Sequence, residues 1–234
     1  SHRPLVSVAV GKRDGYARSV PSRPLTAAFS YSWTAVTCAE ILARRSVRTD
    51  RAAIDRRTRR WAEVLIRAWR IDLRAEGISN IPLDERCVLI INHQSYLDVV
   101  ALFAVLPRVP VFLAKRELGR VPLFGRTLAN AGHVFVDRGN HDRAVESIER
   151  AASSLTPGAQ LAVFPEGTRA TRPEIRAFKK GAFHLARQAH ATIDPIGIHG
   201  SLEAWPRSAL APAPSRVDVR IGAPISAADV VGME

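Results

Sequence analysis

The stretch Val88-Leu89-Ile90-Ile91-Asn92-His93-Gln94-Ser95-Tyr96-Leu97-Asp98 decides the fold of this chain. Its first four residues form an apolar run that is typical of a buried strand. Ser95, followed three residues later by Asp98, is a capping-box pattern, and it opens a second apolar run that Pro107 closes. The stretch therefore predicts a buried strand, a short loop and a helix, with an imidazole and a carboxylate at the junction.

The spacing of His93 and Asp98 limits how the two side chains can meet. In a continuous helix they would point about 140° apart, because each residue turns the helix by about 100°. They can pair only if His93 precedes the helix and Asp98 lies in its first turn, which is where the capping pattern places them. Two interpretations stay open: a histidine–carboxylate dyad, or a helix-capping Asp98 beside an ordinary strand-end histidine.

From residue 81 onward, short apolar runs alternate with helical patterns. The expected strands are residues 87–91, 110–113, 133–136, 160–164, 193–198 and 217–221, and the expected helices are residues 97–106, 124–131, 144–155 and 182–189. This alternation predicts an α/β fold with a mostly parallel sheet flanked by helices. Ligands in such sheets bind at the carboxyl ends of the strands, where His93 lies.

The N-terminal third has a different character. Residues 1–24 carry scattered prolines, glycines and arginines and are expected to form a mobile basic tail. Residues 25–75 are expected to form a helical segment that associates with a membrane, and residues 76–234 to form the α/β domain. The apolar stretch 25–39 is shorter than the ~20 residues needed to span a bilayer, which favours a buried or interfacial helix. Residues 51–73 show an amphipathic helical pattern with a rim of arginines.

Positive charge is concentrated in this N-terminal part. The net charge is +12, and residues 1–74 hold 16 Lys or Arg against 6 Asp or Glu. Such a field attracts polyanions, either nucleic acid or the anionic face of a bilayer. The segment lacks a helix-turn-helix, zinc-finger or RNA-binding signature, and its aromatic residues follow a helix face. A membrane surface is therefore the expected partner, with a basic nucleic-acid-binding module as the remote alternative.

The cysteines and histidines give no sign of a metal centre. Cys38 and Cys87 are far apart and lack a CxxC partner, so neither a disulfide framework nor a thiolate site is indicated. The seven histidines show no HExxH or related spacing. We expect no metal, and a reducing compartment fits this composition.

A second motif, Phe164-Pro165-Glu166-Gly167-Thr168-Arg169, follows the apolar run 160–163. Pro165 and Gly167 favour a tight turn, and the planar guanidinium of Arg169 suits bidentate phosphate recognition. The alternative is ordinary turn chemistry, in which Arg169 pairs with Glu166 or Glu174.

Together the two motifs resemble the glycerolipid and lysophospholipid acyltransferases, the family of 1-acylglycerol-3-phosphate O-acyltransferases. The family's first block, Asn-His-x4-Asp, matches Asn92, His93 and Asp98. Its second block is similar to Gly125 followed by residues 132–138, and its third block is present whole at residues 164–169. The resemblance covers roughly residues 61–225.

The fourth block departs from the family pattern, which usually has two prolines in an apolar strand. This chain keeps only Pro195 and places Asp194 at a normally apolar position. We expect a charge there to be solvated or paired.

The resemblance implies transfer of a fatty acyl group from acyl-CoA or acyl carrier protein to the hydroxyl of a lysophospholipid. The implied acceptor is 1-acylglycerol-3-phosphate, which would give phosphatidic acid in phospholipid biosynthesis, without a cofactor. His93 would be the general base and Asp98 its orienting partner. The residues implied in substrate binding are Glu166, Gly167, Thr168, Arg169, Arg138, Gly125 and Lys115.

Two alternatives remain within this chemistry: another lysolipid acceptor, or a thioester hydrolase that activates water. No Gly-x-Ser-x-Gly elbow surrounds the serines, so a covalent acyl-enzyme is not required. The resemblance also implies a peripheral or monotopic protein at the cytoplasmic face of the cell membrane.

Overall fold

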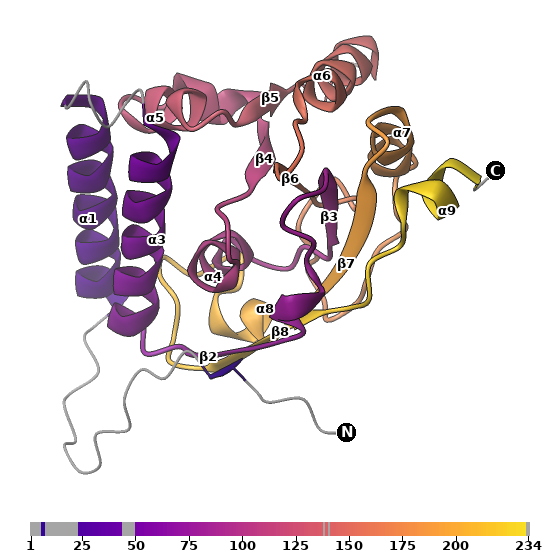
Figure 1. Ribbon diagram of the computed structural model, residues 1–234. Helices are drawn as coiled ribbons and strands as arrows, with labels where there is room; N and C mark the ends of the chain where they lie inside the picture. The colour runs from indigo at the N-terminus through magenta and orange to yellow at the C-terminus, as the bar shows by residue number, and fades with distance from the viewer. Residues whose placement is uncertain (1–5, 8–22, 44–49, 138, 140, 233–234) are drawn as a thin grey trace.

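The computed structural model describes residues 6–7, 23–43, 50–137, 139 and 141–232 (Figure 1). In this part of the chain an eight-stranded sheet has the order β1-β2-β8-β7-β3-β6-β4-β5. Helices cover both of its faces, so the predicted α/β class is confirmed.

The elements follow one another in the order expected of α/β units. The strands are β1 (Val6–Ser7), β2 (Asp72–Glu76), β3 (Cys87–Ile91), β4 (Val111–Lys115), β5 (Val134–Val136), β6 (Gln160–Val163), β7 (Thr192–His199) and β8 (Arg216–Ile221). The α-helices are α1 (Arg23–Ala43), α3 (Arg51–Ala68), α4 (Leu97–Val105), α5 (Phe124–Asn130), α6 (His141–Ser154), α7 (Gly181–Gln188), α8 (Ser201–Ala204) and α9 (Ala227–Gly232). The 3-10 helices are η1 (Ile78–Asn80) and η2 (Arg116–Arg120).

The directions of the strands place the loops that follow them at one edge of the sheet. β3 runs parallel to both β6 and β7, and β4 runs parallel to both β6 and β5. β8 is antiparallel to β7 and parallel to β2. The carboxyl ends of β3, β4, β5, β6 and β7 therefore lie at the same edge, which is the usual ligand-binding edge of such a sheet.

β3 is the centre of the core because both of its faces are covered. Its alternate residues Cys87, Leu89 and Ile91 join the cluster that includes residues of α3 and α4. Val88 and Ile90 join the second cluster, which includes residues of α6 and α7. Successive side chains of a strand point to opposite faces, so a strand between two helical layers must be apolar throughout.

Tryptophans join the N-terminal helices α1 and α3. Trp69 Nε1 donates to Ser30 Oγ at 2.9 Å, and Trp61 Nε1 donates to Thr34 Oγ1 at 2.9 Å. Trp33 Nε1 donates in the other direction, to the Trp61 carbonyl oxygen at 3.3 Å. The hydroxyl residues that interrupt the apolar pattern of α1 therefore satisfy buried indole N–H groups.

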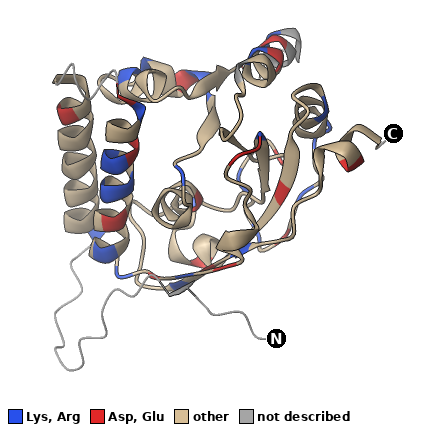
Figure 2. Ribbon diagram, in the orientation of Figure 1, with Lys and Arg blue, Asp and Glu red and all other residues tan. Residues whose placement is uncertain are grey.

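The arginines of α3 (Figure 2, blue) are largely engaged in structural contacts. Arg51 donates to the carbonyl oxygens of Ala131 and Val109, and Arg59 donates to that of Leu106 at 2.6 Å. Arg57 pairs with Glu40 of α1 at 3.1 Å. Much of the basic rim predicted on this helix thus fixes neighbouring chain segments.

The N-terminal boundaries differ from those expected. The helix predicted over residues 51–73 ends at Ala68, and residues 72–76 form β2, which pairs with β8. The expected domain boundary between residues 75 and 76 falls inside this strand. Within the predicted tail, Val6 and Ser7 pair with β2, whereas residues 1–5 and 8–22 lie outside the described residues. Among the described helices, none combines the length and apolar character required to cross a bilayer.

Asp194 of β7 is buried, so the expectation that a charge there would be solvated is wrong, and the partner that it has is a hydroxyl. Its closest polar partner is the Thr192 hydroxyl, which lies 3.2 Å from Oδ2. Burial raises the pKa of this carboxyl to about 6, so the protein reduces the cost of a buried charge by favouring the neutral form.

Replacing Asp194 with Asn should stabilise the protein at neutral pH. Because the folded-state pKa lies above the unfolded value, ionisation costs folding free energy, and this cost grows as the pH rises from about 4 to about 6. We expect Asp194→Asn to raise the free energy of unfolding at pH 7.5 by about 1–3 kcal/mol in urea titrations, with a much smaller difference at pH 4. The exposed Asp84→Asn variant is the control, and an equal gain at both pH values would contradict this account.

Candidate active site

The loop between β3 and α4 is fixed where it leaves the sheet. Asn92 Nδ2 donates to the Ile198 carbonyl oxygen at 2.9 Å, and Asn92 Oδ1 accepts from the Ile198 N–H at 2.7 Å. The Asn92 side chain thus takes the place of the backbone hydrogen bonds that would extend the pairing of β3 with β7. His93 is the next residue, and it begins the loop at the carboxyl edge of the sheet.

Asp98 holds this loop through one carboxylate oxygen. Its Oδ2 accepts the N–H groups of Gln94 and Ser95, each at 2.8 Å, and lies 2.9 Å from His93 Nδ1. Asp98 is 0% exposed. Asp98 therefore pairs with the histidine, and from the first turn of α4 it also accepts the Ser95 N–H, as the acid of a capping box does. Because the carboxylate accepts, Nδ1 carries the proton and the Nε2 lone pair is free to act as a base.

The imidazole of His93 is held in one orientation yet remains accessible. Its ring stacks on Phe164 with centroids 3.8 Å apart and an interplanar angle of 16°. Phe112 stacks behind Phe164 at 5.8 Å. The His93 side chain keeps 11% of its exposure, so the ring is not sealed inside the core.

Glu166 joins the second motif to the first. Its Oε1 accepts the His93 N–H at 2.7 Å, and its Oε2 accepts the Arg176 N–H at 3.0 Å. The Ala170 N–H donates in turn to the His93 carbonyl oxygen at 2.7 Å. We expected Glu166 among the substrate-binding residues, but both of its oxygens bind backbone groups. It is a positioning residue that brings the two motifs together.

Arg169 stacks on an aromatic ring. This contact differs from the alternative interpretation of the sequence, in which Arg169 pairs with Glu166 or Glu174. Its guanidinium carbon lies 3.6 Å from the centroid of the Tyr96 ring, and Tyr96 packs edge-on against Trp205 at 5.9 Å. Burial lowers the pKa of Arg169 from its usual value; the influence of Tyr96 opposes this shift, and the charge of Arg207 adds to it. A guanidinium keeps its charge in proteins, so the site presents a fixed cation.

Gly167 is required by the shape of its turn. It has φ +73°, and a Cβ there would lie 2.9 Å from Lys179 Cε. The Lys179 backbone N–H donates to the Pro165 carbonyl oxygen, which holds the lysine over the turn. Thr168 lies in the same turn and is partly exposed.

Two further predicted site residues, Lys115 and Gly125, have other contacts in the described part of the chain. Lys115, at the carboxyl end of β4, pairs with Glu117 at 3.1 Å. Gly125 lies against the backbone of Gly119, where a Cβ would come 2.2 Å from the carbonyl oxygen, so it allows η2 and α5 to approach closely. Arg138 lies outside the described residues.

Residues that the sequence reasoning missed are Tyr96, Trp205, Arg176 and Lys179. Tyr96 is one of the four variable positions inside the first motif, and an aromatic residue at such a position was the available signal. The Trp205 carbonyl oxygen accepts from Ser95 Oγ at 2.8 Å. No local pattern points to this contact, because it joins segments 110 residues apart.

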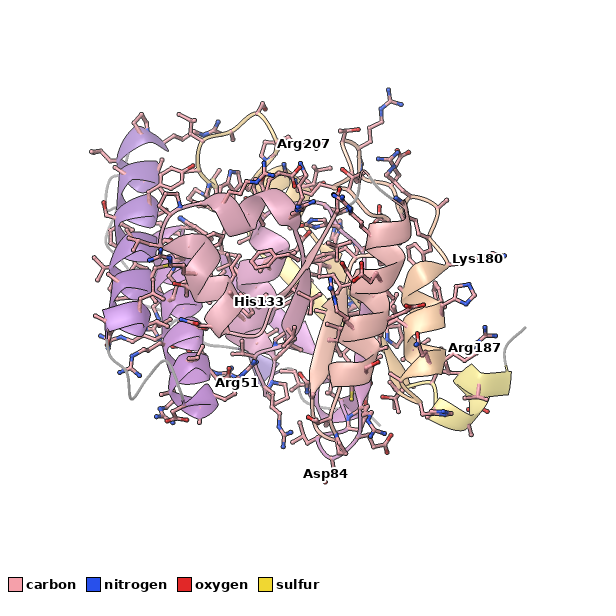
Figure 3. All side chains as sticks on the ribbon, turned by 90° about the horizontal axis from the view of Figure 1, so that it is seen from above. Arg51, Asp84, His133, Lys180, Arg187 and Arg207 are labelled. Atoms are coloured by element: carbon pink, nitrogen blue, oxygen red, sulfur yellow. The ribbon has the colours of Figure 1, made fainter. Side chains whose placement is uncertain are left out.

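His133 belongs to the structural interior (Figure 3). Burial lowers its pKa to about 4, with a further contribution from the charge of Arg51. Its Nδ1 accepts the Phe112 N–H at 3.0 Å, which a neutral imidazole can do. Within the described ranges, no three His, Cys, Asp or Glu side chains are grouped as metal ligands.

The family model described as "Acyltransferase" matches residues 72–199, which is more than half of the chain. The chain therefore belongs to this acyltransferase family. The matched segment contains the His93–Asp98 dyad and the whole Phe164–Arg169 motif, so the resemblance inferred from those two motifs is confirmed.

Relatives within the family agree with this assignment. The chain is 34% identical over 145 residues to a 1-acyl-sn-glycerol-3-phosphate acyltransferase of Cocos nucifera, covering 62% of this chain and 47% of the relative. It is 35% identical over 158 residues to 1-acyl-sn-glycerol-3-phosphate acyltransferase alpha of Mus musculus, covering 67% and 55%. The chain thus spans about half the length of these curated relatives.

The fold is also similar to a solved structure. The crystal structure of the 1-acyl-sn-glycerophosphate (LPA) acyltransferase PlsC from Thermotoga maritima aligns with a TM-score of 0.75 and 25% sequence identity. The alignment covers 88% of this chain and 86% of that chain, so it includes much more than the matched family segment.

Replacing Glu166 with Gln should loosen the contact between the two motifs. Glutamine offers one acceptor oxygen, so either the His93 or the Arg176 N–H loses its partner and faces an amide donor instead. We expect Glu166→Gln to lower the free energy of unfolding by about 1–3 kcal/mol in urea titrations. Glu174→Gln, an exposed change in the same loop, is the control. Equal stability of the two variants would show that Glu166 does not join the motifs.

Proposed function

We propose that this protein transfers a fatty acyl group from a thioester, acyl-CoA or acyl carrier protein, to the free hydroxyl of a lysophospholipid. The acceptor proposed is 1-acylglycerol-3-phosphate, and the product is phosphatidic acid. The observation that best supports this proposal is the hydrogen bond of 2.9 Å between His93 and Asp98. Glu166 connects this pair to the loop that bears Arg169. Membership of the acyltransferase family and the names of the relatives support the choice of substrates.

His93 acts as the general base in this proposal. The acceptor hydroxyl is a poor nucleophile at neutral pH, so its proton moves to His93 Nε2 as its oxygen attacks the thioester carbonyl carbon. The carbon–sulfur bond then breaks, and the imidazolium returns the proton to the leaving thiolate. Ester and free thiol are the products, and no covalent acyl-enzyme forms.

Asp98 keeps the imidazole ready for this step. Its Oδ2 is already fixed by two backbone N–H groups, so it cannot move when the histidine becomes charged. It therefore selects the tautomer with the Nε2 lone pair free and stabilises the imidazolium, as the acid does in a serine-hydrolase triad. The acceptor hydroxyl takes the place that serine has in such a triad.

Arg169 binds the phosphate of the acceptor. Stacking on Tyr96 orients the plane of the guanidinium while leaving its edge of N–H donors available for a bidentate contact. The lysophospholipid is thereby held with its hydroxyl near His93, and such positioning can supply a large share of the barrier reduction. Gly167 and Thr168 shape the turn that carries this contact, and Lys115 and Arg138 are proposed as further phosphate ligands.

Membrane association at the cytoplasmic face is part of the proposal. No charged residue occurs between Arg23 and Glu40 of α1, which is almost free of blue and red in Figure 2. Phe29 and Val36, seven residues apart, are exposed on its outer face, and Tyr31 is exposed as well. An apolar helix face of this kind can lie in the interface of a bilayer as a peripheral or monotopic anchor.

Replacing His93 with Ala should abolish transfer without unfolding the protein. Loss of the base is expected to lower kcat at least 10²-fold, measured by mass spectrometry of phosphatidic acid formed from acyl-CoA and 1-acylglycerol-3-phosphate. His199→Ala, an exposed change on β7, is the control, and circular dichroism confirms folding. Normal turnover by the His93 variant would refute the role of His93 as general base. Rapid thiol release from acyl-CoA without any acceptor would instead identify a hydrolase.

Replacing Arg169 with Ala should act chiefly on acceptor binding. Removing charge-assisted hydrogen bonds worth about 1.5–3 kcal/mol is expected to raise the KM for the phosphate-bearing acceptor about 10- to 150-fold. The KM for the acyl donor should change little. Arg220→Ala, which removes an exposed arginine of β8, is the matched control. An unchanged acceptor KM in the Arg169 variant would rule out the phosphate contact.

A further inference from the structure

The loops around the site form a continuous edge, which we name the site rim. It consists of residues 92–96, 116–123, 164–180 and 200–215 and of the first turn of α1. The loops follow the parallel strands β3, β4, β6 and β7, so they share the carboxyl edge of the sheet. Arg23 and Thr26 of α1 join them by lining a small cavity with Trp69 and Pro214. Figure 3 shows Arg207 on this edge and Asp84 at the opposite edge.

Large exposed hydrophobic side chains gather on the site rim. They are Leu25, Tyr96, Val121, Leu123, Ile175, Phe178 and Leu210. Ile175 is 66% exposed and Leu210 is 65% exposed, although each is a residue type that usually packs inside. At the opposite edge, next to Asp84, the described residues expose Leu83 at 41%. The apolar tips therefore come from separate segments that share the carboxyl edge of the sheet.

The conformation of Leu123 also indicates that its exposure is a specific feature. Leu123 has φ +60°, in a region that residues with a branched side chain rarely adopt. The turn before α5 accepts this strained backbone and presents the leucine to solvent. Strain of this kind tends to be kept at functional positions.

The charge of the rim loops is strongly positive. Residues 116–123, 171–180 and 205–215 contain seven Lys or Arg and two Glu. The cations are Arg116, Arg120, Arg172, Arg176, Lys179, Lys180 and Arg207. Cations interspersed with shallow apolar tips are the pattern of a surface that binds anionic lipid headgroups and inserts side chains between them.

We propose that the site rim is a second membrane-docking surface, which meets the outer face of α1 at Leu25, and that it seats the dyad against an anionic bilayer. This role of the rim rests on the proposed function, which identifies the dyad as the site of acyl transfer. A lysophospholipid could then keep its acyl chain in the bilayer while its headgroup reaches Arg169 and its hydroxyl reaches His93.

The loop of residues 164–180 connects docking to the site. Ile175 lies beside Arg176, whose N–H binds Glu166, and the same Glu166 binds the His93 N–H. Lys179 is held to Pro165 by a backbone hydrogen bond. A membrane contact at Ile175 and Phe178 is therefore transmitted through a short, hydrogen-bonded segment to the catalytic loop.

The test compares the two edges of the sheet in the chain of 234 residues. The double variant Ile175→Glu/Leu210→Glu is measured in cosedimentation with vesicles of phosphatidylglycerol and phosphatidylcholine, and Leu83→Glu is the matched control at the opposite edge. We expect the rim variant to lose at least tenfold in vesicle partitioning and the control to change less than twofold. Transfer to a short-chain, water-soluble acceptor should stay within twofold of the unchanged protein in both, which also shows that both fold.

Two outcomes would overturn the proposal. Unchanged partitioning of the rim variant, with loss only in Val36→Glu of α1, would assign membrane binding to α1 alone. Retained vesicle binding with slower transfer from acyl carrier protein, but not from acyl-CoA, would identify the rim as a surface for an acidic protein. Absence of transfer with every acceptor would refute the proposed function, while the vesicle comparison would still decide the role of the rim.

Discussion

A single carboxylate oxygen organises the site, because Asp98 Oδ2 accepts two backbone N–H groups and contacts the His93 imidazole. The loop between β3 and α4 cannot change shape without breaking these hydrogen bonds together. Glu166 extends the same principle to the next strand, since its two oxygens join the His93 and Arg176 backbones. Buried carboxylates that bind backbone groups thus determine where the imidazole and the guanidinium lie relative to each other.

The positive charge of the chain serves different purposes in different places. On α3, Arg51 and Arg59 donate to carbonyl oxygens at the ends of other segments, which satisfies backbone groups that would otherwise need water. At the site rim, seven cations lie on the loops at the carboxyl edge of the sheet. Net charge alone indicated a polyanionic partner but not the surface that would meet it, because that depends on which cations are engaged in structural contacts.

Much of the sheet could be predicted because its strands are short apolar runs separated by clear helical patterns. The bounds of β3 were predicted to the residue, and those of β6 to within one. β2 was missed because its alternation of buried and exposed residues, from Asp72 to Glu76, continues directly from the amphipathic pattern of α3. The burial of Asp194 could not be inferred either, since it follows from the neighbouring strands. The dyad was predictable because six residues of local sequence, from His93 to Asp98, contain both partners and the cap that bends the chain between them.

The sequence by itself determined the α/β class, the break in the chain that allows His93 to meet Asp98, and the turn at Gly167, because local periodicity, capping and backbone conformation act over a few residues. Only the tertiary structure decided that Glu166 would join the two motifs, that Tyr96 and Trp205 would orient Arg169, and that apolar tips from separate loops would share one edge. Those contacts connect segments tens of residues apart. They exist only after the parallel strands align their carboxyl ends, and no short-range pattern in the chain encodes that alignment.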